Sequence, residues 1–266
     1  MSTWLAGSFR TIRPLSSLVA GVLASASVAA ASGRTTLSIA FAGFAMTALV
    51  MFGFTVNDIF DYRKDRAAEI ERPIARGTFS RHRASWLAAI LLLFACLFGV
   101  LAAHGTTVLA ITGAALFFYS PIARRYPLSK NPYAAALCCA PLYYGALVGR
   151  AYYPWSSYAV LACFALGREI LMDADELSGD IKGGVRTIAA RLGHWRTMRI
   201  GSGLMLISAA VLAVLVHGRL AELTAVATFV GLTWVLCRPG LDDRMRIRLS
   251  RVPMLLGAVA VAFGGT

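Results

Sequence analysis

The sequence predicts an all-α, polytopic integral membrane protein. Of its 266 residues, 58% are hydrophobic and only 15% are charged, and the mean hydropathy is +0.67. Soluble domains carry close to a quarter charged residues, so this composition is far from theirs. Long apolar runs and a one-sided distribution of charge also indicate a membrane protein. We expect a single domain that covers residues 1–266.

Nine apolar runs are long enough to cross a bilayer as helices. They cover residues 15–32, 37–56, 84–103, 106–122, 133–149, 157–172, 201–217, 219–237 and 251–264. Eight spans is the main alternative count, because the last run is short and the seventh and eighth are barely separated. The first 14 residues contain Arg10 and Arg13 among scattered apolar residues, which favours an interfacial helix over a cleavable signal.

The distribution of charge supports nine spans. With nine spans, all Lys and Arg except Arg34, Arg150 and Arg219, and all acids except Glu222, belong to one side. Basic loops stay in the cytoplasm, which predicts a cytoplasmic motif side in a bacterial or archaeal inner membrane. This orientation explains the net charge of +13. No basic stripe is interleaved with aromatic residues, so we expect no nucleic-acid partner.

A first carboxylate motif follows the second apolar run. If the helix continues, Asp58, Asp61 and Asp65 stand at i, i+3 and i+7, within about 60° of one another on its surface. Three carboxylates on one face repel each other unless a cation lies between them. Oxygen ligands of this kind suit Mg²⁺ held jointly by protein and a substrate phosphate. Asn57 would add a neutral oxygen, or would serve as a cap or turn residue.

A second motif repeats this spacing at the end of the sixth run, with Asp173, Glu176 and Asp180. One motif alone is equally typical of a solvated juxtamembrane loop. Here each of two motifs stands at the end of an apolar run, and the two runs are four helices apart. This arrangement predicts two four-helix halves around a central cavity, with the site at their interface. Basic residues follow both motifs, which predicts a diphosphate site; they are Arg72, Arg76, Lys182 and Arg186.

Tyr119 and Arg124 end the fourth run on the same side as the motifs. They are candidates for binding the diphosphate. Position alone favours a simpler interpretation, an interfacial aromatic residue and an anchoring charge.

At these residues the sequence resembles the UbiA superfamily of intramembrane prenyltransferases. The first matching piece is Asn57-Asp58-x-x-Asp61-x-x-x-Asp65, with Arg72-Pro73 and Gly77. The second is Arg168-Glu169 leading into Asp173-x-x-Glu176-x-x-x-Asp180, with Gly179, Gly184, Thr187 and Gly193 beyond. The motifs stand in the family's order, and with the spans they cover nearly the whole chain.

The resemblance implies nine helices around a central cavity, capped by cytoplasmic loops at about 57–83 and 173–199. It implies that both motifs bind Mg²⁺ and the diphosphate of an isoprenoid donor, whose tail lies in a lipid-facing tunnel. The implied metal ligands are Asn57, Asp58, Asp61, Asp65, Asp173, Glu176 and Asp180. Of these, Asp58, Asp61, Asp173 and Asp180 are expected to be indispensable for catalysis.

The chain departs from the family in places that bear on the substrate. Family members often have a lysine four residues after the tyrosine that ends span 4, whereas Ala123 stands four after Tyr119 here. Glu176 replaces the usual Asp. The spacing between Asp65 and Arg72 is similar to the spacing in family branches that act on prenylated glycerol phosphates or chlorophyllides. It is also similar to that of some terpene-cyclising members.

These features together predict a membrane-embedded prenyltransferase. Mg²⁺ and arginines would neutralise the leaving diphosphate, an allylic cation would form, and a lipophilic or aromatic acceptor would capture it. One alternative is a terpene cyclase on the same scaffold. The other is a transporter or lipid carrier, which the concentration of charge at one rim disfavours, since transporters carry ionisable groups near the bilayer midplane.

Overall fold

The computed structural model describes residues 3–30, 35–67, 69–182 and 187–264, without the side chains of residues 3–5, 178–180 and 182. The described part is all-helical, as predicted. The helices are α1 (Thr3–Ile12), α2 (Pro14–Ala30), α3 (Thr36–Ala67), α4 (Arg81–Leu101), α5 (Thr106–Arg125), the 3₁₀ turn η1 (Pro127–Ser129), α6 (Lys130–Gly149), α7 (Trp155–Lys182), α8 (Ile188–Leu192), α9 (His194–Leu215), α10 (Arg219–Cys237), α11 (Asp243–Leu249) and α12 (Arg251–Gly264).

Side-chain caps begin some of the helices. The Ser80 hydroxyl accepts the backbone N–H of Arg83 at the start of α4, and the Asp242 carboxylate accepts that of Met245 at the start of α11. Such caps satisfy N–H groups that the first helical turn leaves free. The first motif lies on the same helix as the second apolar run, because α3 continues to Ala67.

Seven helices in the described ranges are long and apolar enough to cross a membrane. An eighth span results if α1 and α2, which meet at a 45° bend, are counted as one. The predicted number of nine is therefore not confirmed. The long helix α7 is not among the seven, and it carries Arg168 and Glu169 beside its apolar residues.

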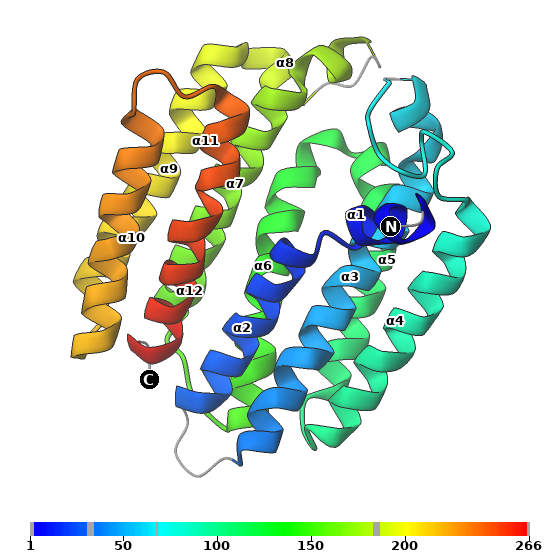
Figure 1. Cartoon of the computed structure of the whole chain (residues 1–266). Helices are drawn as coiled ribbons and strands as arrows, with labels where there is room; N and C mark the ends of the chain where they lie inside the picture. The colour runs from blue at the N-terminus through cyan, green and yellow to red at the C-terminus, as the bar shows by residue number, and fades with distance from the viewer. Residues whose placement is uncertain (1–2, 31–34, 68, 183–186, 265–266) are drawn as a thin grey trace.

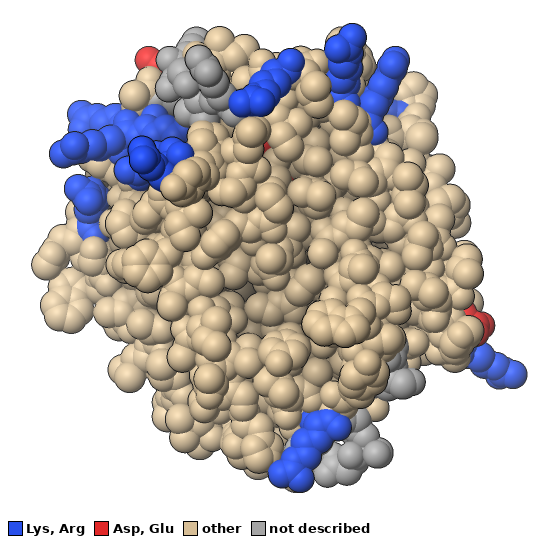
Figure 2. Space-filling view, turned by 180° about the vertical axis from the view of Figure 1, so that it is seen from behind, with Lys and Arg blue, Asp and Glu red and all other residues tan. Residues whose placement is uncertain are grey.

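The outer surface fits a lipid environment. Lys and Arg gather along one edge of the molecule, and a broad uncharged band separates them from the few charges at the other edge (Figure 2). Large apolar side chains such as Trp86, Leu93, Val214 and Val230 are more than half exposed on the outer helices. Exposed apolar area of this extent requires a bilayer. The protein is an integral membrane protein.

The spanning helices form two groups that close into a ring (Figure 1). In the first group α3 packs against α2, α4 and α5, and in the second α7 packs against α6 and α9, with α10 beside α9. The groups meet where α6 contacts α2 and α5, and α12 closes the ring by packing against α10 and α2. The predicted arrangement in halves around a cavity is confirmed.

Glycines allow close helix approaches at these contacts. A Cβ at Gly167 of α7 would lie 2.7 Å from the Gly201 carbonyl of α9, and the reverse distance is the same. A Cβ at Gly145 of α6 would collide with the Ala24 carbonyl of α2. Small residues at helix contacts are the usual way for membrane helices to pack tightly.

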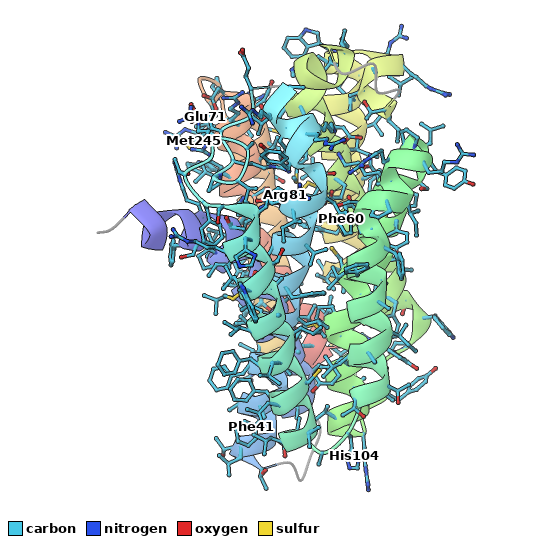
Figure 3. The ribbon with its side chains drawn as sticks, turned by 90° about the vertical axis from the view of Figure 1, so that its right-hand side faces the viewer. Phe41, Phe60, Glu71, Arg81, His104 and Met245 are labelled. Carbon is cyan, nitrogen blue, oxygen red and sulfur yellow. The ribbon has the colours of Figure 1, made fainter. Side chains whose placement is uncertain are left out.

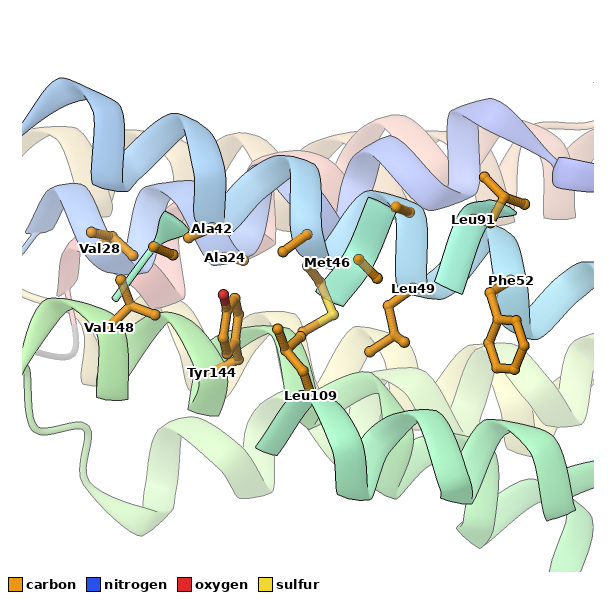
Figure 4. Packing of buried hydrophobic residues seen from close by; sticks show 14 of the residues in the cluster. Ala24, Val28, Ala42, Met46, Leu49, Phe52, Leu91, Leu109, Tyr144 and Val148 are labelled. Carbon is orange, nitrogen blue, oxygen red and sulfur yellow. The ribbon is translucent and has the colours of Figure 1, made fainter. Parts of the chain in front are cut away.

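The two ends of the bundle differ. Figure 3 shows Glu71 and Arg81 at the end that carries both motifs, and Phe41 and His104 at the other. The second end is closed by packing: the Tyr153 hydroxyl donates to the Ala262 carbonyl at 2.8 Å, and Tyr144 is fully buried between helices (Figure 4).

Candidate functional site

A large cavity of about 860 Å³ lies within the bundle, and its lining includes residues of both motifs. Its mouth is polar, with Asp61 and Asp65 from α3, Glu176 from α7 and Arg72 from the loop after α3. Deeper walls are apolar; they are formed by Val19, Leu23, Val50, Phe54, Leu116, Leu137, Leu161, Phe164, Leu212 and Val261. The cavity thus has the shape of a site for an amphiphile, with a charged head at the mouth and an apolar tail inside.

Arg72 connects the two motifs. Its NH1 atom lies 2.8 Å from Oδ2 of Asp65 and 3.4 Å from Oδ1 of Asp58, and its NH2 atom lies 3.9 Å from Oε1 of Glu176. Burial alone would lower the pKa of Arg72, but the carboxylates of Asp58 and Asp65 outweigh burial and raise the pKa. The guanidinium therefore stays charged at the cavity mouth.

Lys130, at the first position of α6, is the matching cation of the second motif. Its Nζ lies 2.8 Å from Oδ1 of Asp173 and 3.7 Å from Oε2 of Glu176. Asn131 donates from Nδ2 to Oδ2 of Asp173 at 2.7 Å, so both carboxylate oxygens are held. Lys130 lines the same cavity as Ala123, the position at which family members often have a lysine.

Arg13, at the bend between α1 and α2, is a third cation that lines the cavity, after Arg72 and Lys130. Its NH2 atom donates to Oδ1 of Asp58 at 3.0 Å, and its guanidinium lies 4.6 Å from the centre of the Phe54 ring. The sequence reasoning overlooked Arg13, Lys130 and Asn131 as site residues. Their signal was weak: an arginine before a proline, and a Lys-Asn pair at the start of an apolar run.

Contacts between α3 and α5 fix the rest of the first motif. The Ser120 hydroxyl donates to Oδ1 of Asn57 at 2.7 Å. Arg124 donates from NH2 to the Phe60 carbonyl at 2.8 Å and approaches Oδ1 of Asp61 at 3.5 Å. Asn57, Asp61 and Arg124 all line the cavity.

The predicted site residues whose side chains the structure describes fall into three groups. The cavity is lined by Asn57, Asp61, Asp65, Arg72, Tyr119, Arg124 and Glu176. Asp58 and Asp173, which are 2% and 1% exposed, lie behind this lining and hold its cations. Arg76 is exposed and pairs with Glu71. The side chains of Asp180 and Lys182 and the whole of Arg186 lie outside the described residues.

The donor chemistry at the mouth fits a hard divalent cation. The cavity-lining motif residues Asn57, Asp61, Asp65 and Glu176 offer carboxylate and amide oxygens. Oxygen-only sets of this kind select Mg²⁺ over softer metals. Among the described residues no three His, Cys, Asp or Glu side chains are close enough to hold a metal by themselves. The individual ligand assignments stay predictions.

A ring of membrane helices, with a charged mouth that joins two carboxylate motifs over an apolar cavity, defines an intramembrane site for an anionic amphiphile. The sequence profile of the UbiA prenyltransferase family matches residues 17–244 of this chain. The chain belongs to this family and is a prenyltransferase, which confirms the resemblance seen in its motifs.

The most similar curated proteins include two archaeal enzymes named digeranylgeranylglyceryl phosphate synthase. The enzyme of Thermococcus kodakarensis is 29% identical over 71% of this chain and 70% of its own length. That of Halobacterium salinarum is 30% identical over 74% of this chain and 72% of its own.

Solved structures share the fold. A UbiA homologue from Aeropyrum pernix superimposes with a TM-score of 0.80 at 19% identity, over 93% of this chain and 97% of its own. A UbiA homologue from Archaeoglobus fulgidus, solved with geranyl diphosphate and Mg²⁺, gives 0.73 at 14% identity, over 97% and 98%.

Proposed function

We propose that this prenyltransferase moves a prenyl group from a polyprenyl diphosphate to a lipophilic acceptor inside its membrane cavity. The observation that carries the proposal is Arg72, which contacts carboxylates of both motifs at the mouth of an apolar cavity. One diphosphate bound there would contact residues of both halves of the bundle. The apolar walls below would hold the isoprenoid chain.

The reaction breaks the bond between C1 of the prenyl chain and the bridging diphosphate oxygen, and the electron pair leaves with the diphosphate. Arg72 and Lys130 at the mouth would stabilise the charge that develops on this leaving group. The allylic carbon then bonds to a nucleophilic atom of the acceptor, which loses a proton if it is a hydroxyl group. Glu169 lines the cavity and is a candidate to accept that proton.

The oxygens of Asn57, Asp61, Asp65 and Glu176 would hold Mg²⁺, with Asp58, Asp173 and Asp180 as further predicted ligands. When bound, the metal supplies positive charge against the diphosphate.

The walls around the reacting carbon would protect it from water. Phe54 and Tyr119 line the cavity near the motifs, and their ring faces would stabilise a nearby cation. A carbocation that meets water gives only the prenyl alcohol, so exclusion of water directs the reaction to the acceptor.

The named relatives support a lipid acceptor. Their name describes a glyceryl phosphate with two geranylgeranyl chains, the product of adding a prenyl group to a lipid. The concentration of Lys and Arg at the motif-bearing end supports an active site that faces the cytoplasm. Cysteine labelling tests this orientation: outside reagents should reach Arg150→Cys and Tyr152→Cys but not Ala190→Cys, in a chain whose native cysteines are replaced. Labelling of Ala190→Cys from outside would reverse the orientation.

The experiment for the activity is incubation of the purified protein with geranylgeranyl diphosphate and Mg²⁺, with and without a lipid alcohol as acceptor, followed by mass spectrometry. We expect a condensed ether or carbon-linked product only when the acceptor is present. Without it, slow hydrolysis should be the only reaction. Rapid formation of one cyclic terpene without acceptor would show a cyclase instead.

A further inference from the structure

His194, the first residue of α9, contacts the helix of the second motif from outside the cavity. Its Nδ1 atom lies 3.2 Å from the carbonyl oxygen of Ala174, which follows Asp173 on α7. Its Nε2 atom lies 2.8 Å from Oδ2 of Asp243 on α11. The imidazole therefore links the motif-bearing part of α7 to α11, which packs against α7 (Figure 1). The binding of diphosphate and metal does not account for this residue.

Both partners of the His194 ring are hydrogen-bond acceptors. The carbonyl of Ala174 has no proton to donate. Asp243 also accepts from NH1 of Arg246 through Oδ1 at 3.2 Å, which fits an ionised carboxylate whose second oxygen is likewise an acceptor. A neutral imidazole carries one N–H group and satisfies one of the two acceptors, whereas an imidazolium satisfies both. The geometry therefore fits the imidazolium form of His194.

Asp243 supplies the negative charge that this imidazolium requires. The N-terminal end of a helix disfavours positive charge, and His194 begins α9. The side chains of His194 and Asp243 are 35% and 27% exposed, so water and salt only partly screen their attraction. The neighbouring ion pair of Arg244 with Asp175 has less influence on α7, because Arg244 is 72% exposed and exposed ion pairs contribute little.

The neighbouring elements carry further charges around this contact. At this end of the bundle they are Asp173, Asp175 and Glu176 on α7, Arg191 on α8, Arg196 on α9, Arg238 after α10, Arg244 and Arg246 on α11, and Arg251 on α12. The acids of this set pair with Lys130 or Arg244. Arginines stay charged at every pH at which histidine titrates, so the charge that changes in that range belongs to His194.

The contact lies on the face of α7 that points away from the cavity. At about 100° per residue, Ala174 stands roughly 130° around the helix from the direction midway between Asp173 and Glu176. Ala174 is 3% exposed and belongs to an apolar cluster shared by α7, α9 and α11. A hydrogen bond at its carbonyl opposes rotation of α7 about its axis. Such a rotation would turn Asp173 away from Lys130 and Glu176 away from the cavity.

We propose that His194 is a positioning residue: its imidazolium, compensated by Asp243, holds α7 at Ala174 and thereby directs Asp173 and Glu176 toward their roles in binding the donor. This inference rests on the proposed function, in which the second motif binds the donor diphosphate. When the imidazolium loses a proton, the remaining one lies on Nε2, toward the negative carboxylate, and the Ala174 carbonyl then faces a lone pair on Nδ1. Donor binding should therefore weaken as the pH rises through the range in which histidine titrates.

The test is the Kd of an unreactive thio-analogue of geranylgeranyl diphosphate in Mg²⁺, measured at about pH 6 and about pH 8.5, on either side of the histidine range. The diphosphate gains protons toward the lower pH, so each variant is compared with the native protein at the same pH. His194→Ala should bind about three- to tenfold more weakly at the lower pH, the effect of one lost hydrogen bond, and within about twofold of native at the higher pH. His194→Asn should restore most of the affinity at the lower pH, because its amide can donate to the Ala174 carbonyl.

His82→Ala is the matched control. His82 follows Arg81 at the motif-bearing end (Figure 3), accepts a hydrogen bond from Trp86 and does not line the cavity. This variant should leave the Kd unchanged at both pH values. Equal weakening by His194→Ala at both pH values would show a merely structural role and overturn the proposal. Native affinity of His194→Ala at the lower pH would also overturn it.

Hydrogen exchange of the protein without donor or metal separates this proposal from the proposed function. At the lower pH, the backbone amides of residues 174–178 should exchange faster in His194→Ala than in the native protein or His194→Asn. This result would support the hold on α7 even if the native protein bound no analogue, in which case the proposed function would fail alone. Equal exchange in all three proteins would overturn the proposal.

The charge of the ring can be read directly from the ¹⁵N spectrum of histidine-labelled protein. The signals of His194, assigned by their loss in His194→Ala, should show two protonated ring nitrogens at the lower pH. In Asp243→Asn the second proton should be lost at a lower pH than in the native protein, since an amide does not compensate the imidazolium. A His194 ring with one proton at the lower pH in the native protein would overturn the proposal.

Discussion

The two carboxylate motifs have the same spacing, and the structure gives the first two positions of each motif the same environment. The first member of each, Asp58 and Asp173, is buried behind the cavity wall and held by cations. The middle member of each, Asp61 and Glu176, lines the cavity. The cations come from different places: Arg72 follows its motif along the chain, whereas Lys130 precedes its motif by 43 residues. Equivalent sites can thus be built from non-equivalent segments.

In each motif the first residue is buried and holds a cation, whereas the middle residue lines the cavity. The division explains why both clusters need a basic partner in the folded state. A buried carboxylate without a cation costs several kcal/mol, roughly 3–5 when one partner of a buried pair is removed. The two halves therefore depend on Arg72 and Lys130 for folding as well as for binding.

The largest expected effect comes from the buried members. Asp58→Asn keeps the side-chain shape but removes the carboxylate that pairs with Arg13 and one of those that pair with Arg72. Asp173→Asn removes the nearer of the two carboxylates that pair with Lys130. Turnover should therefore fall at least ~100-fold. Steady-state rates on protein that is monodisperse by size exclusion would measure this. Asp175→Asn is the control, since Asp175 contacts Arg244 and does not line the cavity. A loss at only one of the two motifs would break the equivalence.

A smaller effect is expected at the cavity-facing members. Activity should require Mg²⁺ or Mn²⁺, disappear with a chelator and return with metal. Asp61→Asn and Glu176→Gln should each raise the metal concentration for half-maximal rate by about tenfold, because each removes one charged oxygen ligand. Metal titrations of the rate would show this. Full activity in excess EDTA would contradict the metal assignment.

The smallest effect concerns the nature of the two cations. Arg72 holds carboxylates of both motifs through different nitrogens, whereas Lys130 acts through a single ammonium group. Arg72→Lys should therefore reduce kcat/KM by roughly tenfold, and Lys130→Arg by only a few-fold, since lysine cannot reproduce a guanidinium fork. Kinetics with geranylgeranyl diphosphate would compare them. The reverse order would show that the bridge through Arg72 is unimportant.

Much of the fold could be predicted because hydropathy directly reflects the bilayer. Each of the nine apolar runs coincides, over most of its length, with a helix of the described residues. The number of spans was less predictable, because α7 carries Arg168 and Glu169 beside its apolar residues and α1 bends away from α2. The motif spacing correctly predicted that Asp61 and Glu176 reach one cavity.

What the sequence could not supply are contacts between distant segments. The Lys130–Asp173 and Arg13–Asp58 pairs join residues more than 40 positions apart, and only the packing of α6 on α7 and the bend before α2 bring them together. Helical spacing also placed Asp58 on the same face as Asp61, but it could not show that its carboxylate lies behind the cavity lining.

The account's central claim is that both motifs bind one diphosphate. The most direct test is the Kd of an unreactive thio-analogue of geranylgeranyl diphosphate, measured in Mg²⁺ for the native protein, Arg72→Gln and Lys130→Gln. If both cations contact the same diphosphate, each substitution should weaken binding by at least ~10-fold, as expected for a lost charge-assisted contact. Weakening by one substitution, with native affinity in the other, would show that the two motifs do not share one diphosphate.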